Sequence, residues 1–219
     1  MGLQNKITRR AISGQLGALA GITLVSPAMA GSMLVTPPQV KGPFYPVEDQ
    51  ADKDLDLTMI KGHTEAATGE PLLVRGRVYS ANGKPLANAL VDIWQANHHG
   101  RYSHAKDPNT APLDEHFQGW GIVRTDADGY YNFKTVKPGA YSLSFLGGDG
   151  WRCRHIHFKV THDSQPALIT QMYFDGDPLI AQDLEIAKAP ESQRHLLIAK
   201  SVHDDASGLP LYTFDVVLG

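Results

Sequence analysis

The fold is decided by two strand-like runs, LLVRGRVY at residues 72–79 and ALVDIWQ at residues 89–95, with Asn82-Gly83 between them. Both runs are rich in β-branched and aromatic residues, and Asn-Gly favours tight turns between paired strands. The same arrangement recurs where Asp126-Ala127-Asp128-Gly129 separates two further runs. The remaining strands are predicted at Ile122–Thr125, Tyr130–Val136, Tyr141–Leu146, Arg154–Thr161, Ile169–Phe174 and Leu211–Leu218. Turn signals at this short spacing predict an all-β fold, an antiparallel β-sandwich of about eight strands.

Two segments do not follow the strand pattern. Pro190–Lys200 is the one stretch that predicts a helix, with proline at a first-turn position. Residues 31–71 are rich in proline and glycine, and we expect them to form an ordered N-terminal arm over the sandwich of residues 72–219.

The composition limits the kinds of function. The chain has 219 residues, 42% hydrophobic and 20% charged, with a net charge of −3. This lack of a basic surplus argues against nucleic-acid binding. The single cysteine, Cys153, excludes an intrachain disulfide and a thiolate-cluster metal site. A metal ion would have to be held by histidine, carboxylate or phenolate groups.

Residues 1–30 have the features of a cleaved export signal. Lys6, Arg9 and Arg10 precede an apolar stretch at Leu16–Val25, and Ala28-Met29-Ala30 forms an A-x-A cleavage site. The paired arginines resemble a twin-arginine signal, which directs export of folded proteins. We therefore expect a mature protein that begins at Gly31, located in the periplasm or secreted, with no membrane association once it is processed.

His155-Ile156-His157 is the sharpest chemical signal. Residues two apart on a strand share a face, so both imidazoles can reach one metal ion while Ile156 and Phe158 point to the core. The alternative is a solvent-facing polar edge, which Lys159 on the same face favours. The remaining histidines show no mutual spacing that requires a metal: His63, His98, His99, His104, His116, His162, His195 and His203.

Tyr102 and Tyr141 are the other candidates, but spacing alone does not connect them to the histidines. Tyr102 lies in a loop after Gly100-Arg101, and Tyr141 follows Pro138-Gly139-Ala140. Each alone is more often an amphipathic residue at the edge of a core. Cys153 lies between Arg152 and Arg154, where it is either a passive small side chain or a thiolate activated by positive charge.

A family resemblance connects these residues. The sequence resembles the intradiol ring-cleavage dioxygenases over about residues 41–218, and in particular their protocatechuate-cleaving branch. The segments that carry the resemblance are GPFYP at 42–46, VDIWQAN at 91–97, GRYSH at 100–104, TDADGYY at 125–131, KPGAY at 137–141, Trp151-Arg152 and HIHF at 155–158.

The resemblance implies one non-haem Fe(III) per chain, with Tyr102, Tyr141, His155 and His157 as metal ligands. It also implies catalytic roles for three residues: Arg152 stabilises negative charge on the ring, Gln171 orients substrate or oxygen intermediates, and Tyr141 gives way to the substrate. The expected reaction opens a protocatechuate-like catechol between its hydroxyl carbons, with both atoms of O2 in a cis,cis-muconate-type product. Residues 142–150 line the substrate pocket in that family. Its protocatechuate members pair catalytic and partner subunits, so we expect a homo-oligomer or pairing with a related subunit.

Two other interpretations remain. The segments around residues 75–90 and 126–141 also resemble transthyretin-like modules, which predict a non-enzymatic binding protein. A zinc or Fe(II) hydrolase could instead use His155, His157 and a carboxylate. Both alternatives predict a colourless protein, whereas tyrosinate bound to Fe(III) absorbs visible light.

Overall fold

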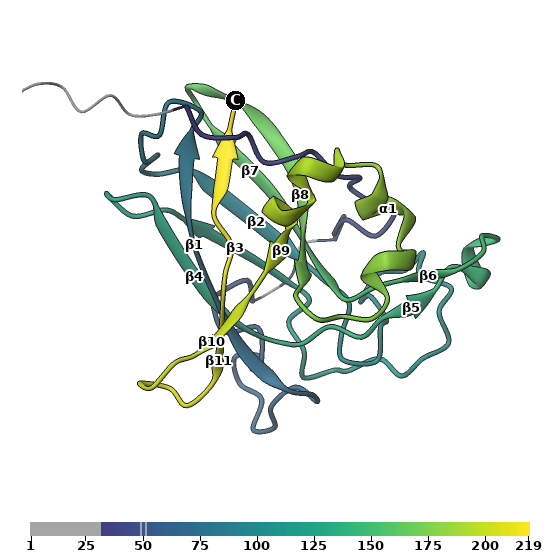
Figure 1. Cartoon of the computed structure of the whole chain (residues 1–219). Helices are drawn as coiled ribbons and strands as arrows, with labels where there is room; N and C mark the ends of the chain where they lie inside the picture. Colours follow the sequence, from purple (N-terminus) through teal and green to yellow (C-terminus); the bar gives the residue numbers. More distant parts are fainter. Residues whose placement is uncertain (1–31, 49, 51) are drawn as a thin grey trace, which may run out of the picture.

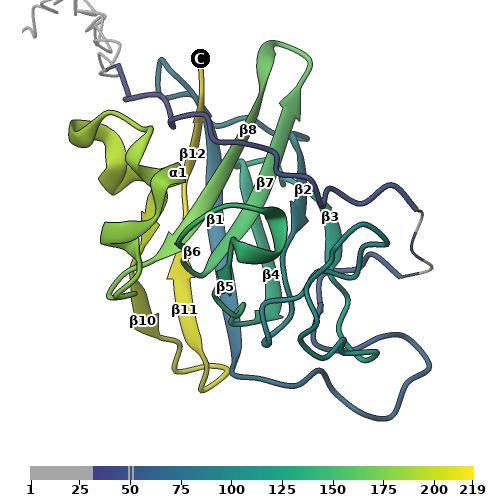
Figure 2. The same ribbon diagram turned by 90° about the vertical axis from the view of Figure 1, so that its right-hand side faces the viewer.

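The computed structural model describes residues 32–48, 50 and 52–219. Two five-stranded sheets face each other as a sandwich (Figures 1 and 2). The first sheet orders its strands β10-β11-β1-β12, with β4 also paired to β1, and the second orders them β3-β2-β7-β8-β9. The larger strands are β1 (Pro71–Ser80), β2 (Leu90–Trp94), β3 (Trp120–Arg124), β4 (Tyr130–Val136), β7 (His155–His162) and β8 (Gln165–Phe174). The short strands are β5 (Tyr141–Ser142), β6 (Trp151–Arg152), β9 (Ile198–Ala199), β10 (Ser201–His203), β11 (Pro210–Thr213) and β12 (Val216–Leu218).

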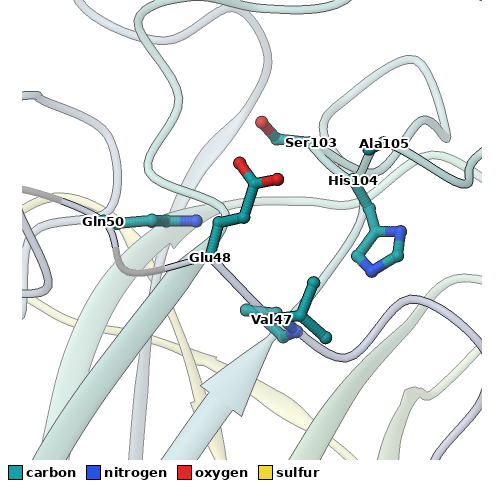
Figure 3. Close-up of a pocket in the computed structure, with 7 residues that line it drawn as sticks. Val47, Glu48, Gln50, Ser103, His104 and Ala105 are labelled. Atoms are coloured by element: carbon teal, nitrogen blue, oxygen red, sulfur yellow. The ribbon is translucent and has the colours of Figure 1, made fainter.

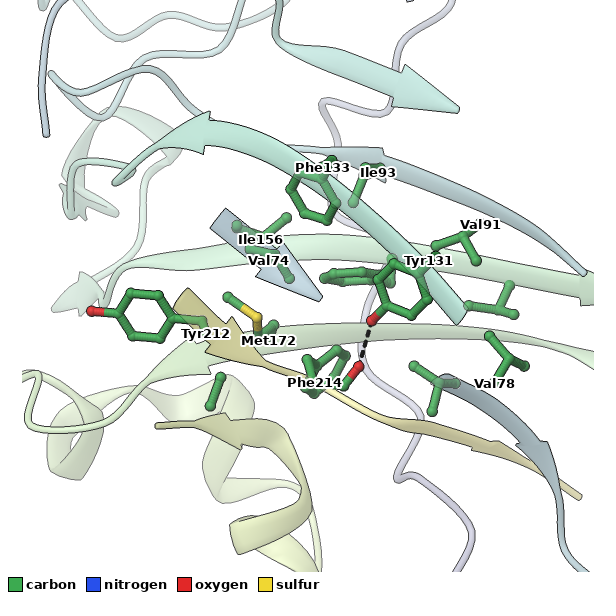
Figure 4. Close-up of a cluster of buried hydrophobic side chains, with 14 of the residues drawn as sticks. Val74, Val78, Val91, Ile93, Tyr131, Phe133, Ile156, Met172, Tyr212 and Phe214 are labelled. Carbon is green, nitrogen blue, oxygen red and sulfur yellow. Dashed lines mark hydrogen bonds between the residues drawn. The ribbon is translucent and has the colours of Figure 1, made fainter. Parts of the chain in front are cut away.

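Apolar side chains from both sheets form the core. Alternate residues of β1 point inward, and Val74 and Val78 meet Ile93, Ile156 and Met172 from the second sheet (Figure 4). All five side chains are fully buried, and burial of this apolar area is the main favourable term in folding. The predicted all-β sandwich is therefore confirmed.

Gly76 allows the sheet to close around an aromatic residue. A Cβ atom at position 76 would overlap the carbonyl oxygen of Phe214 and lie 2.5 Å from the hydroxyl of Tyr131. The Tyr131 hydroxyl donates to the Phe214 carbonyl (Figure 4). Only glycine leaves room for this contact between β4 and the segment that joins β11 to β12.

The predicted strand at 211–218 is interrupted, and its pairing is parallel rather than antiparallel. β11 and β12 both pair with β1 in parallel and in one continuous register, in which Leu73 faces Leu211 and Val78 faces Val216. At the interruption, the Asp215 carboxylate accepts the backbone N–H of Arg77 at 2.9 Å. The Asp215 side chain thus takes the place of a backbone carbonyl as the hydrogen-bond acceptor for Arg77.

Two other boundaries differ from the sequence prediction. The strand expected at 141–146 ends at Ser142, and Ser144–Leu146 form a 3₁₀ turn that ends at Gly147 in the left-handed conformation. The helix expected at 190–200 is a 3₁₀ helix over Glu191–Leu197, because its bonds connect residues three apart, as from Gln193 N–H to the Pro190 carbonyl. The α-helix is α1 at Leu184–Ala187, a segment that the periodicity did not indicate.

Residues 33–48 and 52–57 lie along both sheets rather than forming a separate core. The purple segment of Figure 2 crosses the second sheet, where Gln39 N–H donates to the Ile169 carbonyl of β8. Further along, Leu57 N–H bonds the Lys134 carbonyl of β4, and the Leu57 side chain is fully buried. The expected signal peptide at 1–30 lies outside the described residues. Within the described part of the chain, no helix is long and apolar enough to cross a membrane.

Candidate metal centre and active site

His155 and His157 lie on β7 with their side chains on the face opposite the main core. Their alternation with Ile156 and Phe158 follows from the period of two in a strand. Both imidazoles are buried, with 2% and 3% of their surface exposed, which excludes the solvent-facing polar edge. Gln171 pairs with His157 across β7 and β8, so it lies on the same face.

The fold brings Tyr102 to both histidines. The Tyr102 hydroxyl oxygen lies 3.3 Å from Nε2 of His155 and 3.1 Å from Nε2 of His157. The Tyr141 ring centroid lies 6.0 Å from that of Tyr102 and 5.8 Å from that of His155. The two imidazoles, predicted from strand geometry to reach one metal ion, and the two phenols, predicted as ligands only through a resemblance, therefore gather at one point.

Gly100 explains why the two tyrosines meet. Its φ of +82° is in the left-handed region, and a Cβ atom there would lie 2.6 Å from the carbonyl oxygen of Ala140. The loop that holds Tyr102 can thus lie directly against the segment that leads into Tyr141. The buried Asp107 carboxylate accepts the Tyr102 backbone N–H at 2.7 Å and fixes this loop.

Neighbouring groups orient the histidine rings. Nδ1 of His155 lies 2.7 Å from the Cys153 carbonyl, an acceptor that requires the proton on Nδ1 and leaves Nε2 with a free lone pair. The Trp94 ring stacks on His157 at a centroid distance of 4.7 Å and an angle of 7°. Nδ1 of His157 is buried and makes no hydrogen bond within the described residues.

Burial controls the protonation of the active-site cluster, which consists of Tyr102, Tyr141, His155 and His157. Burial, aided by the positive charge of Arg152, holds the pKa of His155 well below its usual value, and burial with the nearby His155 does the same to His157. Burial also raises the pKa of Tyr102 and of Tyr141. Without a metal ion, the chain therefore presents two neutral imidazoles and two protonated phenols.

Arg152 is held beside the cluster by a buried ion pair. Its Nε lies 2.9 Å from the Asp183 carboxylate, and its Nη2 donates to Oε1 of Gln171. Burial opposes the charged form, but Tyr141 and Asp183 raise the pKa of Arg152 above its ordinary value, so the guanidinium stays charged. The pairing partner is therefore the buried Asp183 and not a surface carboxylate such as Asp149.

Cys153 is a buried residue rather than an activated thiolate. Its side chain is fully buried, and its thiol lies 3.2 Å from the Asp183 carboxylate. Burial and this negative charge raise the pKa of Cys153 well above its usual value. Of the two alternatives that the sequence left open, burial and the Asp183 carboxylate favour the passive side chain, because the guanidinium groups of Arg152 and Arg154 are paired with Asp183 and Asp177.

A cavity of about 180 Å³ opens on the cluster. Tyr141, His157 and Arg152 reach its wall, and the other residues that line it are Val40, Gly42, Pro43, Phe44, Leu143, Leu146 and Glu185. Leu143 and Leu146 come from residues 142–150, as the resemblance implied. A volume below the roughly 300–1,000 Å³ of sites for drug-sized ligands suits a substrate with a single ring.

A second hollow lies beyond Phe44. It is lined by Pro46, Val47, Glu48, Gln50, Ser103, His104 and Ala105 (Figure 3). The His104 ring contacts Phe44 at 5.8 Å, but none of the four cluster residues lines this hollow. Among the described residues, no other histidine makes a hydrogen bond or ring contact with the cluster; His63 and His116, for example, pair with each other at 3.2 Å.

The donor set fits a ferric ion. Phenolate is a hard anionic donor, and imidazole is a good ligand for iron. Both Nε2 atoms converge on a phenol oxygen in a site closed to solvent. In the part of the chain that the structure describes, no three histidine, cysteine or carboxylate side chains are grouped as a metal site.

Comparisons with known proteins agree with this geometry. The sequence profile of a family described as dioxygenase matches residues 40–219. The chain is 45% identical over 179 residues to the protocatechuate 3,4-dioxygenase beta chain of Burkholderia cepacia, covering 80% of this chain and 76% of that one. It is 38% identical to a catechol 1,2-dioxygenase of Acinetobacter lwoffii, covering 73% of this chain and 58% of that longer protein.

Solved structures give the same result. The dioxygenase domain of a carbohydrate-binding fusion protein from Streptomyces sp. SirexAA-E matches with a TM-score of 0.61 and 30% identity, over 84% of this chain and 97% of that one. The 3-chlorocatechol 1,2-dioxygenase of Rhodococcus opacus 1CP matches with a TM-score of 0.65 and 25% identity, over 84% of this chain and 72% of that one.

The family match and these relatives show that the β-sandwich, with its buried tyrosines and histidines beside a small cavity, is that of a ring-cleaving dioxygenase. The chain belongs to the intradiol ring-cleavage dioxygenase family, which its sequence motifs resemble. It is an enzyme of that class and not a non-enzymatic binding module.

Sequence reasoning missed the residues that support the site. Asp183 pairs with Arg152 and also accepts the Glu185 backbone N–H at 2.8 Å as the cap of α1. An aspartate before a short helical run was the available signal. The stacking of Trp94 on His157 had no signal, because it depends on the register of β2 against β7.

Proposed function

We propose that this protein is a non-haem Fe(III) intradiol dioxygenase that opens a catechol ring between its two hydroxyl carbons. Both atoms of O2 would enter a cis,cis-muconate-type dicarboxylate. The observation that carries the proposal is the approach of the Tyr102 hydroxyl to Nε2 of both histidines, at 3.1 and 3.3 Å, beside a cavity that Arg152 lines. Protocatechuate and catechol are the first substrates to test, because proteins named for them are among the relatives.

Tyr102, Tyr141, His155 and His157 would hold the ion. When bound, it would act as a Lewis acid and lower the pKa of the phenols and of a catechol. The neutral histidines need to lose no proton to serve as ligands. Each tyrosine must lose one, so its phenolate exists only with the metal.

Tyr141 is the tyrosine proposed to yield its place to the substrate. Of the two phenols, Tyr141 lines the cavity and Tyr102 does not. A Tyr141 phenolate that meets the substrate can accept the proton of one catechol hydroxyl, which leaves the substrate as its monoanion. The proton of the second hydroxyl would leave to solvent, because the metal would lower the pKa of that hydroxyl. Tyr102 would stay between the two histidines.

Arg152 is proposed to stabilise the negative charge that develops on the ring. Its guanidinium is permanently charged and held rigid by Asp183, so little reorganisation is needed during the reaction. Gln171 was expected to orient substrate directly, but its Oε1 accepts from Arg152 and its Nε2 donates to the Val40 carbonyl at 2.8 Å. We therefore assign Gln171 as a positioning residue that acts through Arg152.

The test is product analysis after reaction of the iron-loaded protein with catechol and protocatechuate under ¹⁸O2. We expect cleavage between the hydroxyl carbons and two ¹⁸O atoms in the product. Tyr102→Phe should lose this activity, whereas Tyr130→Phe, at an exposed tyrosine on β4, should retain it. A product cleaved beside the hydroxyl carbons, or no oxygen uptake, would overturn the proposal.

Location and assembly are proposals of the same kind. The paired arginines and A-x-A site of residues 1–30 support export to the periplasm by the twin-arginine route. The relative from Burkholderia cepacia is named a beta chain, which supports pairing of this chain with a related subunit or with itself. Light scattering of the purified protein would measure the assembly.

A further inference from the structure

We propose that Glu185 makes the active-site cavity select catechols that carry no carboxylate. This inference rests on the proposed ring-cleaving function and narrows its substrate class. Glu185 lines the cavity together with Arg152, Tyr141 and His157, and its side chain is only 21% exposed. A negative charge therefore lies on the wall that a ring substituent of the substrate would meet.

The position of Glu185 is fixed by the group that also fixes Arg152. One Asp183 oxygen accepts the Glu185 backbone N–H at 2.8 Å, and the other accepts Nε of Arg152 at 2.9 Å. Asp183 is fully shielded from solvent, so this arrangement is rigid. The backbone of Glu185 and the guanidinium of Arg152 are consequently fixed by the same buried carboxylate, and both residues line one cavity.

The described wall of the cavity offers a substituent carboxylate no cation beyond Arg152. That guanidinium is already paired with Asp183 and bonded to Gln171, and its proposed role is toward the ring itself. Lys188 bonds the Glu185 carboxylate at 2.7 and 2.8 Å, but its side chain is 61% exposed and is not part of the wall. This ion pair is partly exposed and screened by water, so it offsets part of the negative charge of Glu185.

The rest of the wall favours neutral rings. Val40, Pro43, Phe44, Leu143 and Leu146 contribute apolar surface, which gains nothing from an anionic substituent. Unsubstituted catechols and catechols with apolar groups meet this wall without charge repulsion, and a cationic group can meet the carboxylate of Glu185. Protocatechuate carries a carboxylate that would approach Glu185 or lose its hydration against apolar side chains.

The experiment measures binding and turnover separately. The iron-loaded protein is titrated calorimetrically without oxygen with catechol, 3,4-dihydroxybenzoate and 3,4-dihydroxybenzylamine, and oxygen uptake is recorded for the same compounds. The variant is Glu185→Gln, which keeps the backbone N–H that Asp183 caps. The matched control is Glu191→Gln, at an exposed glutamate that does not line the cavity.

We expect the dihydroxybenzoate to bind about tenfold more weakly than the other two compounds, because water and the Lys188 ion pair reduce the repulsion between the two carboxylates. Glu185→Gln should abolish that difference, and Glu191→Gln should leave it unchanged. Equal or tighter binding of the dihydroxybenzoate to the wild type, or a preference that Glu185→Gln does not alter, would overturn the inference. If the binding order holds but no compound is cleaved, the proposed function fails and the charge selection stands; absence of binding by all three compounds contradicts both.

Discussion

Replacement of Arg152 by alanine should destabilise the fold as well as the reaction. The guanidinium and the Asp183 carboxylate are 7% and 0% exposed, so removal of the arginine leaves a buried negative charge without its counterion. Loss of one partner of a buried ion pair costs about 3–5 kcal/mol. The carboxylate keeps the N–H groups of Cys153 and Glu185, which favours the lower end of that range.

A loss of about 3 kcal/mol corresponds to a fall in Tm of roughly 6–12 °C for a chain of this length. Thermal unfolding followed by circular dichroism measures it. Lys188→Ala removes an exposed ion pair and should cost at most about 1 kcal/mol, so it serves as the control. Asp183→Asn in the Arg152→Ala background should restore part of the stability, because the uncompensated charge is gone.

Arg152→Ala should also lower the rate of ring cleavage. Loss of a charge that stabilises the transition state lowers the rate about a hundredfold, even in the fraction that remains folded with iron bound. The ion-pair argument would be refuted if the Tm of Arg152→Ala fell by less than about 2 °C, which corresponds to a loss of only about 1 kcal/mol. Full activity of that variant would remove Arg152 from the reaction and leave the metal site intact.

The remaining predictions concern protons, the thiol and export. Iron affinity should rise with pH by up to about a hundredfold per pH unit, because burial raises the pKa of both tyrosines and each must release a proton, while the histidines are already neutral. Competition with a chelator at several pH values measures this affinity. A flat profile would contradict tyrosinate ligation. Cys153 should react with a thiol reagent only after denaturation, since it is fully buried; rapid labelling of the native protein would show otherwise. Arg9→Lys with Arg10→Lys should block export, and periplasmic protein that begins at Met1 would refute cleavage at Gly31.

The strands were predictable because their signals are local. Alternation in residues 72–79 and the turn at 126–129 are encoded in neighbouring residues, and the structure forms a strand at the first place and a turn between β3 and β4 at the second. The parallel pairing of β1 with β11 and β12 was not predictable, because it joins residues 138 positions apart in the sequence through the closure of the whole sandwich.

Part of the site was predictable from local sequence, and part was not. The shared face of His155 and His157 follows from strand geometry alone. Their meeting with Tyr102 depends on Gly100, whose close contact with Ala140 has no signature in a single sequence, so only the family resemblance indicated it. Asp183 was missed because its partners, Arg152 and Cys153, are about 30 residues away along the chain.

Metal analysis with visible spectroscopy tests the central claim most directly. The protein purified after expression with iron should contain one iron per chain and be coloured by tyrosinate bound to Fe(III). His155→Ala and His157→Ala should lose the iron, and Tyr102→Phe should shift or remove the visible band, while Tyr130→Phe keeps both. A colourless protein with stoichiometric zinc and no iron, or a visible band that Tyr102→Phe leaves unchanged, would contradict the assignment of Tyr102, Tyr141, His155 and His157 as the ligands.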